Sequence, residues 1–292
     1  METKMNRREL ARRLAMAGLA IPFVTRWNVE AAPPPGKPAT GDASPPNHDM
    51  SGYGIPQGPP QQIAMLVYPQ MTVLDLIGPQ QLLSSLGNVE VHLVWKDRNL
   101  VTSDSGVTLQ PSATFETCPK SLTLLFVPGG SQGTVACMRD PEVLDFLAGR
   151  GAGAGYVTSV CTGSLLLGAA GLLEGYRATS HWQTRSLLSL VGATPVEARV
   201  VEDRNRITGA GVTAGLDFGL RVASRLRNEK YAKALQLAYE YDPQPPYQAG
   251  TPAGAGPEIT GMMNAMYAPV LASMTEAARL ARARHPGRER SE

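Results

Sequence analysis

Cys161 is the residue whose surroundings most favour covalent chemistry. An apolar run, Tyr156–Val160, leads directly to it, and Thr162-Gly163-Ser164 and a stretch of small and apolar residues follow. This pattern predicts a buried strand, a tight turn at the cysteine and then a helix, an arrangement that projects a nucleophile from the end of a strand. A helix start also favours an anion, so a thiol there loses its proton more easily. The alternative is a buried structural cysteine, the usual environment of a free cysteine.

A glycine pair is expected at the same edge of the sheet. The strand that ends at Phe126-Val127-Pro128 is followed by Gly129 and Gly130, which allow a close approach of backbone to a ligand. Their N–H groups would lie near Cys161 and hold negative charge that develops on a substrate. Alone, Pro-Gly-Gly is a common turn, but beside a strand-to-helix cysteine it indicates a substrate-binding loop.

Asp75 is the candidate acid. It lies between two leucines, after the first predicted strand and just before a helix expected to start at Gly78-Pro79. One interpretation is a capping aspartate. The other places it beside the thiol, in a partly apolar pocket where a carboxyl group keeps its proton and serves as a general acid.

Two other features are ambiguous. The segment from Gly209 to Gly215 is rich in glycine like a dinucleotide-binding loop, but a helix is expected after it and no second strand, so it predicts a tight turn near the site. His181 is either a base for Cys161 or an ordinary histidine at a helix start. The other three histidines are too scattered to form a metal cluster with it.

Short apolar runs alternate with helical stretches from residue 63 onward, the pattern of strands buried on both faces of a parallel sheet. The fold class predicted is α/β, a doubly wound, mostly parallel sheet with sites at the carboxyl ends of its strands. The strands expected first are Ile63–Tyr68, Val89–Trp95, Leu122–Val127 and Tyr156–Val160. Hairpins are expected over Thr102–Gln110, at the sheet edge, and around Asp203-Arg204-Asn205. Helices are expected up to Leu86, over Pro141–Leu147, from Cys161 to Gly171, and over Trp182–Leu190, Thr213–Arg225, Tyr231–Tyr241 and Ile259–Arg284, the last with a methionine stripe for packing.

The amino terminus has the pattern of an export signal. The twin arginines Arg7 and Arg8 precede an apolar stretch, Leu14–Val24, and a small-residue cleavage site near Ala31. Residues 1–31 therefore predict a twin-arginine signal peptide and a protein outside the cytoplasm, and residues 32–60, rich in Pro and Gly, a flexible linker. We expect a folded domain over residues 61–250 and a helical extension with a basic tail over residues 251–292.

Composition excludes several classes of protein. Hydrophobic residues make up 43% and charged residues 18% of the chain, a globular balance without an apolar run that would span a bilayer. The formal charge of +2 comes from the first 31 residues, so the rest has no electrostatic reason to bind nucleic acid. Cys118, Cys137 and Cys161 are an odd number, which leaves at least one thiol free or intermolecular.

The chain resembles the ThiJ/PfpI superfamily, a group of flavodoxin-like, glutamine amidotransferase-like proteins with a reactive elbow cysteine, and within it the isocyanide hydratase branch. The resemblance covers roughly residues 62–250. It rests on the segment from Cys161 to Trp182, on Leu74–Pro79, on Val91–Lys96, and on Gln236–Pro243 with Pro245-Pro246.

This resemblance implies a cofactor-free hydratase that converts a small-molecule isocyanide to an N-substituted formamide. Cys161 would attack the terminal carbon and form a thioimidate, Asp75 would supply and recover protons, and Thr162 would assist by its hydroxyl group or backbone N–H. Gly129 and Gly130 would shape the pocket. A homodimer is also implied, with no nucleic acid partner and no stable membrane insertion.

Two other readings stay open. One is a non-catalytic ligand or redox sensor of the same fold, as in the sensing half of AraC-like regulators, although the stretch after Pro245-Pro246 is too short for their DNA-binding domain. The other is a peptidase-like or glyoxalase-like member, which usually pairs its cysteine with a histidine or a glutamate.

Overall fold

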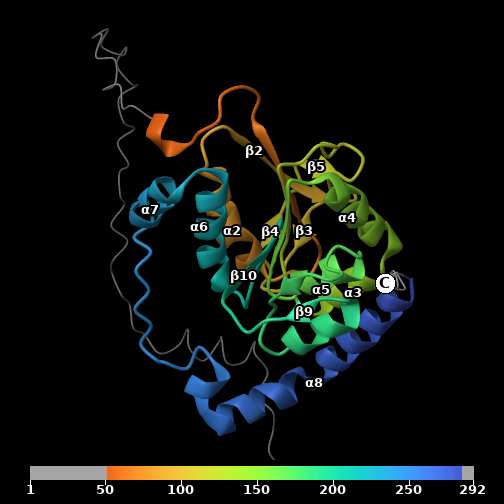
Figure 1. Cartoon of the computed structure of the whole chain (residues 1–292). Coiled ribbons are helices and arrows are strands. Elements are labelled where there is room, and N and C mark those ends of the chain that lie inside the picture. Colours follow the sequence, from red (N-terminus) through yellow and green to blue (C-terminus); the bar gives the residue numbers. More distant parts are fainter. Residues whose placement is uncertain (1–50, 285–292) are drawn as a thin grey trace, which may run out of the picture. The chain divides into compact units, whose positions relative to one another are not determined.

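A seven-stranded, mostly parallel sheet forms the centre of the computed structural model, which describes residues 51–284 (Figure 1). The strand order is β10-β11-β7-β6-β1-β2-β5. Neighbouring strands are parallel except β10 and β11, which form the hairpin predicted around Arg204. The predicted α/β fold with a doubly wound sheet is confirmed. The strands are β1 (Gln61–Leu66), β2 (Val89–Trp95), β5 (Ala113–Thr114), β6 (Leu124–Val127), β7 (Tyr156–Val160), β10 (Val200–Asp203) and β11 (Arg206–Gly209).

Helices cover both faces of this sheet (Figure 1). On one face α2 packs on α6, and α6 packs on α7; on the other, α3 packs on α4 and α5. Helix α8 and the 3₁₀ helix η2 contact the second group. These helices are α2 (Val73–Ser84), α3 (Gln132–Arg139), α4 (Pro141–Gly153), α5 (Gly163–Ala169), η2 (Arg185–Val191), α6 (Ala214–Leu226), α7 (Glu229–Ala238) and α8 (Pro252–Arg284).

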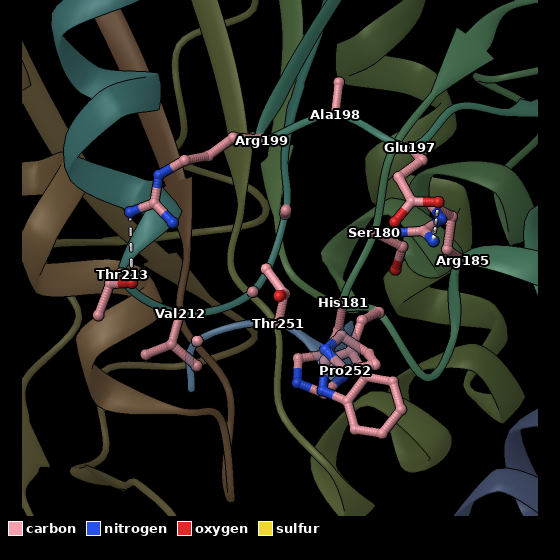
Figure 2. A pocket seen from close by; sticks show the side chains of 14 residues that line it. Ser180, His181, Arg185, Glu197, Ala198, Arg199, Val212, Thr213, Thr251 and Pro252 are labelled. Atoms are coloured by element: carbon pink, nitrogen blue, oxygen red, sulfur yellow. Dashed lines mark hydrogen bonds and ion pairs between the residues drawn. The ribbon is translucent and has the colours of Figure 1, made fainter. Parts of the chain in front are cut away.

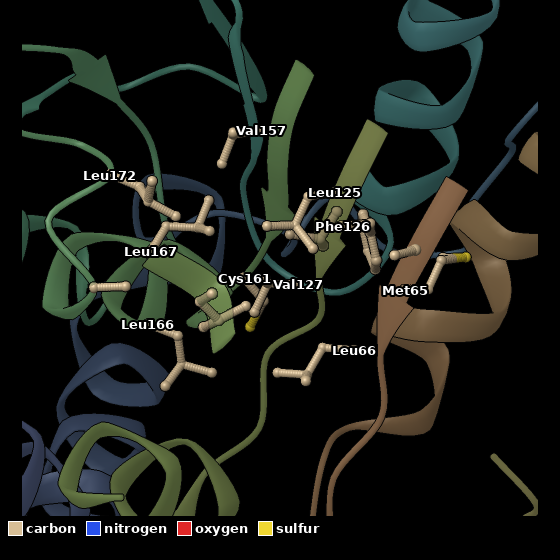
Figure 3. Packing of buried hydrophobic residues seen from close by; sticks show 14 of the residues in the cluster. Met65, Leu66, Leu125, Phe126, Val127, Val157, Cys161, Leu166, Leu167 and Leu172 are labelled. Atoms are coloured by element: carbon tan, nitrogen blue, oxygen red, sulfur yellow. The ribbon is translucent and has the colours of Figure 1, made fainter. Parts of the chain in front are cut away.

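The central strands are buried along most of their length because both faces of the sheet are covered. All four residues of β6 are buried, as are the last four of β1 and of β7. Figure 3 shows side chains of these strands packed with Leu166 and Leu167 of α5, close to Cys161. The core therefore lies directly under the carboxyl ends of β6 and β7, where the candidate nucleophile is located.

Helix α2 begins five residues earlier than predicted. The sequence places its start at Gly78-Pro79, whereas α2 begins at Val73 and contains Pro79 in its interior. Proline has no N–H, so it cannot donate to the carbonyl of Asp75 one turn before it. The Pro79 ring instead packs on α6, where a Cβ on Gly215 would lie 3.0 Å from it. The earlier start puts Asp75 inside the first turn of a helix.

Other predictions are corrected in detail. The segment predicted as a helix from Trp182 to Leu190 forms the 3₁₀ helix η2. The hairpin expected over Thr102–Gln110 exists, but as a separate two-stranded sheet that is not hydrogen-bonded to the central one. Its strands are β3 (Val101–Thr102) and β4 (Thr108–Leu109); the remaining short elements are η1 (Ser51–Tyr53), β8 (Arg177–Ala178) and β9 (Thr194–Pro195).

Helix α8 starts before the predicted Ile259 and bends at Gly256, which has a φ of 79°. Only half of the predicted methionine stripe, which consists of Met262, Met266, Val270 and Met274, packs as expected. Met274 is 2% exposed and Val270 is buried, but Met262 and Met266 are each 61% exposed. Within residues 51–284 no helix is long and apolar enough to cross a membrane.

The predictions for the two ends of the chain remain predictions. The signal peptide (1–31), the linker as far as residue 50 and the tail from residue 285 lie outside the described residues. The last part of the linker, however, is not a free spacer. The Asn228 side chain donates to the Gly52 carbonyl at 3.0 Å, and the Asn88 side chain donates to the Pro56 carbonyl at 2.9 Å.

The turn into α5 yields a stability prediction. A Cβ on Gly163 would lie 2.2 Å from the Val127 carbonyl oxygen, so Gly163→Ala must displace backbone. We expect a loss of about 1–3 kcal/mol in the free energy of unfolding, measured by urea denaturation. Gly149→Ala is the control, because Gly149 in α4 faces open space, and it should gain about 0.5–1 kcal/mol. Equal effects of both variants would contradict a tight turn.

Candidate active site

Cys161 occupies a strained elbow between β7 and α5. Its φ is 57°, in the left-handed region that residues other than glycine rarely adopt. The Cys161 N–H donates to the carbonyl oxygens of Gly209 (3.1 Å) and Ala210 (2.8 Å), which hold the turn against the end of β11. Strain of this kind persists where surrounding structure enforces it, commonly at active sites. The strand-to-helix elbow expected from the sequence is therefore present.

Gly129 brings the predicted loop and the predicted acid to the cysteine. A Cβ on Gly129 would lie 2.6 Å from Asp75 Oδ2, 2.7 Å from Cys161 Cβ and 2.7 Å from the Thr162 nitrogen. Such distances exclude any side chain at this position. Asp75, Gly129, Cys161 and Thr162, which are far apart in sequence, thus meet at the carboxyl ends of the strands.

The Asp75 carboxyl group is fully buried. Burial raises its pKa from 3.8 to about 7, while contacts with the Cys161 thiol and the Gly129 N–H favour the ionised form. Among the described residues, no donor meets both the distance and the angle of a hydrogen bond to either Asp75 carboxyl oxygen. The sequence predicted a carboxyl that keeps its proton, and the direction of this pKa shift agrees with that prediction.

The Cys161 thiol differs from expectation. The sequence predicted that the start of a helix would lower its pKa, but burial and the neighbouring Asp75 raise the pKa well above 9.0. The backbone N–H groups of Thr162 and Val212 act in the opposite direction without overcoming burial. Protonation of Asp75 removes its repulsion of a thiolate, so the two groups are coupled.

Thr162 supports the loop through its side chain. Its hydroxyl group donates to the Gly130 carbonyl at 2.7 Å and accepts from the Gly130 N–H at 2.9 Å. Thr134 Oγ1 lies 2.9 Å away and Tyr68 Oη a further 3.1 Å on, forming a buried chain of hydroxyl groups. The hydroxyl of Thr162 is therefore fully engaged, and its backbone N–H is the part that reaches the sulfur.

The N–H groups of the glycine pair are not free to bind a substrate anion, contrary to the sequence-based expectation. The Gly130 N–H is bonded to Thr162, and the Gly129 N–H faces Asp75. Thr162 and Val212 supply the N–H groups nearest the sulfur instead. Val212 was missed by sequence reasoning, although the glycine-rich segment from Gly209 to Gly215 pointed to a tight turn near the site.

A small cavity of about 80 Å³, the thiol cavity, lies over Cys161. Its roof is Tyr267, Val270, Leu271 and Met274 of α8, none of which was predicted as a site residue. The remaining lining residues are Thr72, Gly130, Ser131, Thr162, His181, Gln183, Thr184 and Val212. The apolar spacing in α8 was visible in the sequence, but nothing in it told which surface the helix covers.

A larger pocket of about 390 Å³, the outer pocket, adjoins the thiol cavity. Figure 2 shows the ion pair Arg185–Glu197, at 3.0 Å, on one side of this pocket and Arg199 with Thr213 on the other. His181 and Val212 line both spaces.

The hydrogen bond found for His181 does not involve the thiol: the Gln183 N–H donates to its Nδ1 at 3.4 Å. Burial lowers the pKa of His181, so the ring is neutral. Among residues 51–284 no three His, Cys, Asp or Glu side chains gather as metal ligands would. Cys118 and Cys137 are buried and unpaired, and burial raises the pKa of Cys137 to about 12.

The fold and site define a class of protein: a flavodoxin-like α/β domain with a cysteine elbow and a buried carboxyl beside it. Residues 61–225 match the DJ-1/PfpI family, and the chain belongs to that family. The ThiJ/PfpI resemblance seen in the sequence is thereby confirmed.

Two relatives cover most of the chain. It is 49% identical over 215 residues to the isonitrile hydratase of Pseudomonas putida, an alignment that spans 74% of this chain and 93% of the relative. The crystal structure of a ThiJ/PfpI family protein from Pseudomonas syringae superposes with a TM-score of 0.77 at 50% identity, covering 84% and 98% of the two chains. A more distant relative is the transcriptional regulator GbdR of Pseudomonas aeruginosa, 28% identical over 63% of this chain and 51% of its own length.

Asp75 yields a pH-dependent stability prediction. In the folded protein Asp75 holds its proton up to about pH 7, whereas in the unfolded chain it releases the proton near pH 3.8. The stability of the fold therefore decreases as the pH rises between these two values. Asp75→Asn should therefore be more favourable to stability at pH 8 than at pH 4. The two changes in the free energy of unfolding, measured by urea denaturation, should differ by at most about 4 kcal/mol. Asp145→Asn, an exposed carboxyl in α4, is the control for charge loss. A gain that does not change with pH would refute the raised pKa.

Proposed function

We propose that the protein is a cysteine-dependent, cofactor-free isocyanide hydratase, in which Cys161 forms a thioimidate with the substrate. The observation that carries the proposal is the buried pair of Asp75 and Cys161, held together across Gly129. The 49% identity to an isonitrile hydratase supports the reaction class.

The addition step needs one proton and one nucleophile. The pair enters this step with one proton, which lies on the Asp75 carboxyl group in the reactive form and leaves Cys161 as a thiolate. The Thr162 and Val212 N–H groups stabilise the sulfur. The sulfur then bonds to the terminal carbon of R–N≡C, and Asp75 delivers the proton to that carbon. The product is R–N=CH–S–Cys161, and Asp75 is left ionised.

Hydrolysis restores the pair. Water adds across the C=N bond, placing a hydroxyl on carbon and a proton on nitrogen, with the Asp75 carboxylate accepting and returning a proton. Collapse of this adduct breaks the C–S bond and releases R–NH–CHO, and the sulfur takes back a proton. A carboxyl pKa of about 7 suits a group that must donate in one step and accept in the next.

Formamide production from phenyl isocyanide by the purified protein tests this proposal, with the reaction followed by ultraviolet absorbance. We expect turnover in the wild type and a loss of at least about 10³-fold in Cys161→Ser, because the nucleophile is removed. Cys118→Ser, which alters a buried thiol outside the site, should retain activity.

The opposite result would indicate a different reaction at Cys161. If the wild type does not turn over isocyanide, while iodoacetamide alkylates Cys161 faster than Cys118 and Cys137, the cysteine is reactive but the reaction is another one. Activity in Cys161→Ser equal to that of the wild type would exclude the thioimidate.

A further inference from the structure

The thiol cavity is too small for most of a substrate. At about 80 Å³ it is roughly half the size of an engineered protein cavity of about 150 Å³ that admits benzene. A cavity of this size suits the isocyano group itself beside Cys161. A larger substituent therefore needs either a displaced roof or an opening into a neighbouring space.

The roof is firmly attached. The Gln183 side chain donates to the Met263 carbonyl at 3.2 Å, which connects the segment before η2 to α8 across the cavity. Ion pairs Arg139–Glu276, at 2.7 Å, and Arg282–Glu174 tie the same helix to α3 and to the segment after α5. Three alanines of α8, at positions 277, 278 and 281, are also buried, and α8 contacts both α3 and α5. Lifting α8 would break all of these interactions together.

The boundary between the thiol cavity and the outer pocket involves few residues. His181 and Val212 are the two side chains that line both spaces. The outer pocket, about 390 Å³, is within the usual size range of small-molecule sites. One change of rotamer at His181 costs far less than detaching a helix.

A contact with Gly211, in the glycine-rich segment, explains the position of the His181 ring. A Cβ on Gly211 would be 2.8 Å from His181 Cδ2, so the imidazole packs directly on the Gly211 backbone. The ring is neutral because burial lowers its pKa. An uncharged, planar wall of this kind suits contact with an apolar or aromatic substituent.

We propose that His181 is the specificity-determining residue of the site: the isocyano group enters the thiol cavity, the substituent lies in the outer pocket, and the His181 ring separates the two. The favoured substrates are isocyanides whose substituent is the size of an aromatic ring or larger. This inference rests on the proposed function for the reaction, but the placement of the substituent can be tested without it.

Alkylation of Cys161 tests the route independently of catalysis. Rates with iodoacetamide and with the bulkier N-phenylmaleimide are measured by mass spectrometry of the Cys161 peptide, and their ratio reports access for large groups. His181→Ala should raise the relative rate of the bulky reagent by about tenfold or more, a steric effect typical of pocket truncation. Val212→Ala should act in the same direction and less strongly. His92→Ala, a histidine on β2 that bonds to Gln62, should leave the ratio unchanged.

The competing route is tested by Met274→Ala, which thins the roof. The proposal is overturned if Met274→Ala raises the ratio while His181→Ala and Val212→Ala do not, or if none of the three changes it. The same variants are then assayed for kcat/KM with phenyl and methyl isocyanide. If isocyanide is never turned over but His181→Ala raises the alkylation ratio, the proposed function fails and the route to the thiol stands.

Discussion

The close approach of three chain segments at Gly129 is the constraint on which the rest of the site depends. With no side chain at that position, the loop after β6 fits between the carboxyl of Asp75 and the elbow at Cys161. Both groups are buried around this contact, Asp75 completely and Cys161 to 6% exposure. Burial, in turn, is the main cause of the raised pKa values of the acid and of the thiol.

The fold supplies this contact through the order of its strands. β6 and β7 are parallel neighbours, so the loop after one and the elbow after the other emerge side by side. β1 pairs with β6 on the opposite side, and the segment after it carries Asp75 in the first turn of α2. The hydrogen-bonded hydroxyl groups of Tyr68, Thr134 and Thr162 then hold the loop after β6 at Gly130. The site is thus built on strand ends and not on a long loop, which favours a precise geometry.

Much of this arrangement was predictable from the sequence, because local patterns encode it. Apolar runs indicated buried strands, and Cys161 with Thr162-Gly163 indicated the elbow. The start of α2 was not predictable, since proline usually marks the first turn of a helix, whereas Pro79 lies inside α2 and packs on Gly215 of the distant helix α6. The sign of the thiol pKa shift was also wrong, because local sequence shows the helix start and not the depth of burial.

The roof and the wall of the cavity depend on contacts between distant segments. The spacing of Val270 and Met274 in the sequence indicated an apolar helix face. It did not indicate that this face covers Cys161, which lies more than a hundred residues earlier in the chain. His181 could not be separated from an ordinary histidine until its contact with Gly211 was known. These parts of the site come from α8 and from the segment before η2, which line the same cavity and are joined by the hydrogen bond from Gln183 to Met263.

The protonation state of Asp75 tests the account most directly. An infrared titration that compares the wild type with Asp75→Asn isolates the carbonyl band of the neutral carboxylic acid. The account predicts that this band is present below pH 7, disappears with a midpoint of about 7, and is missing in the variant. A carboxyl group that is already ionised at pH 5, with a midpoint near that of a free aspartate, would contradict the coupled acid and thiol on which the mechanism depends.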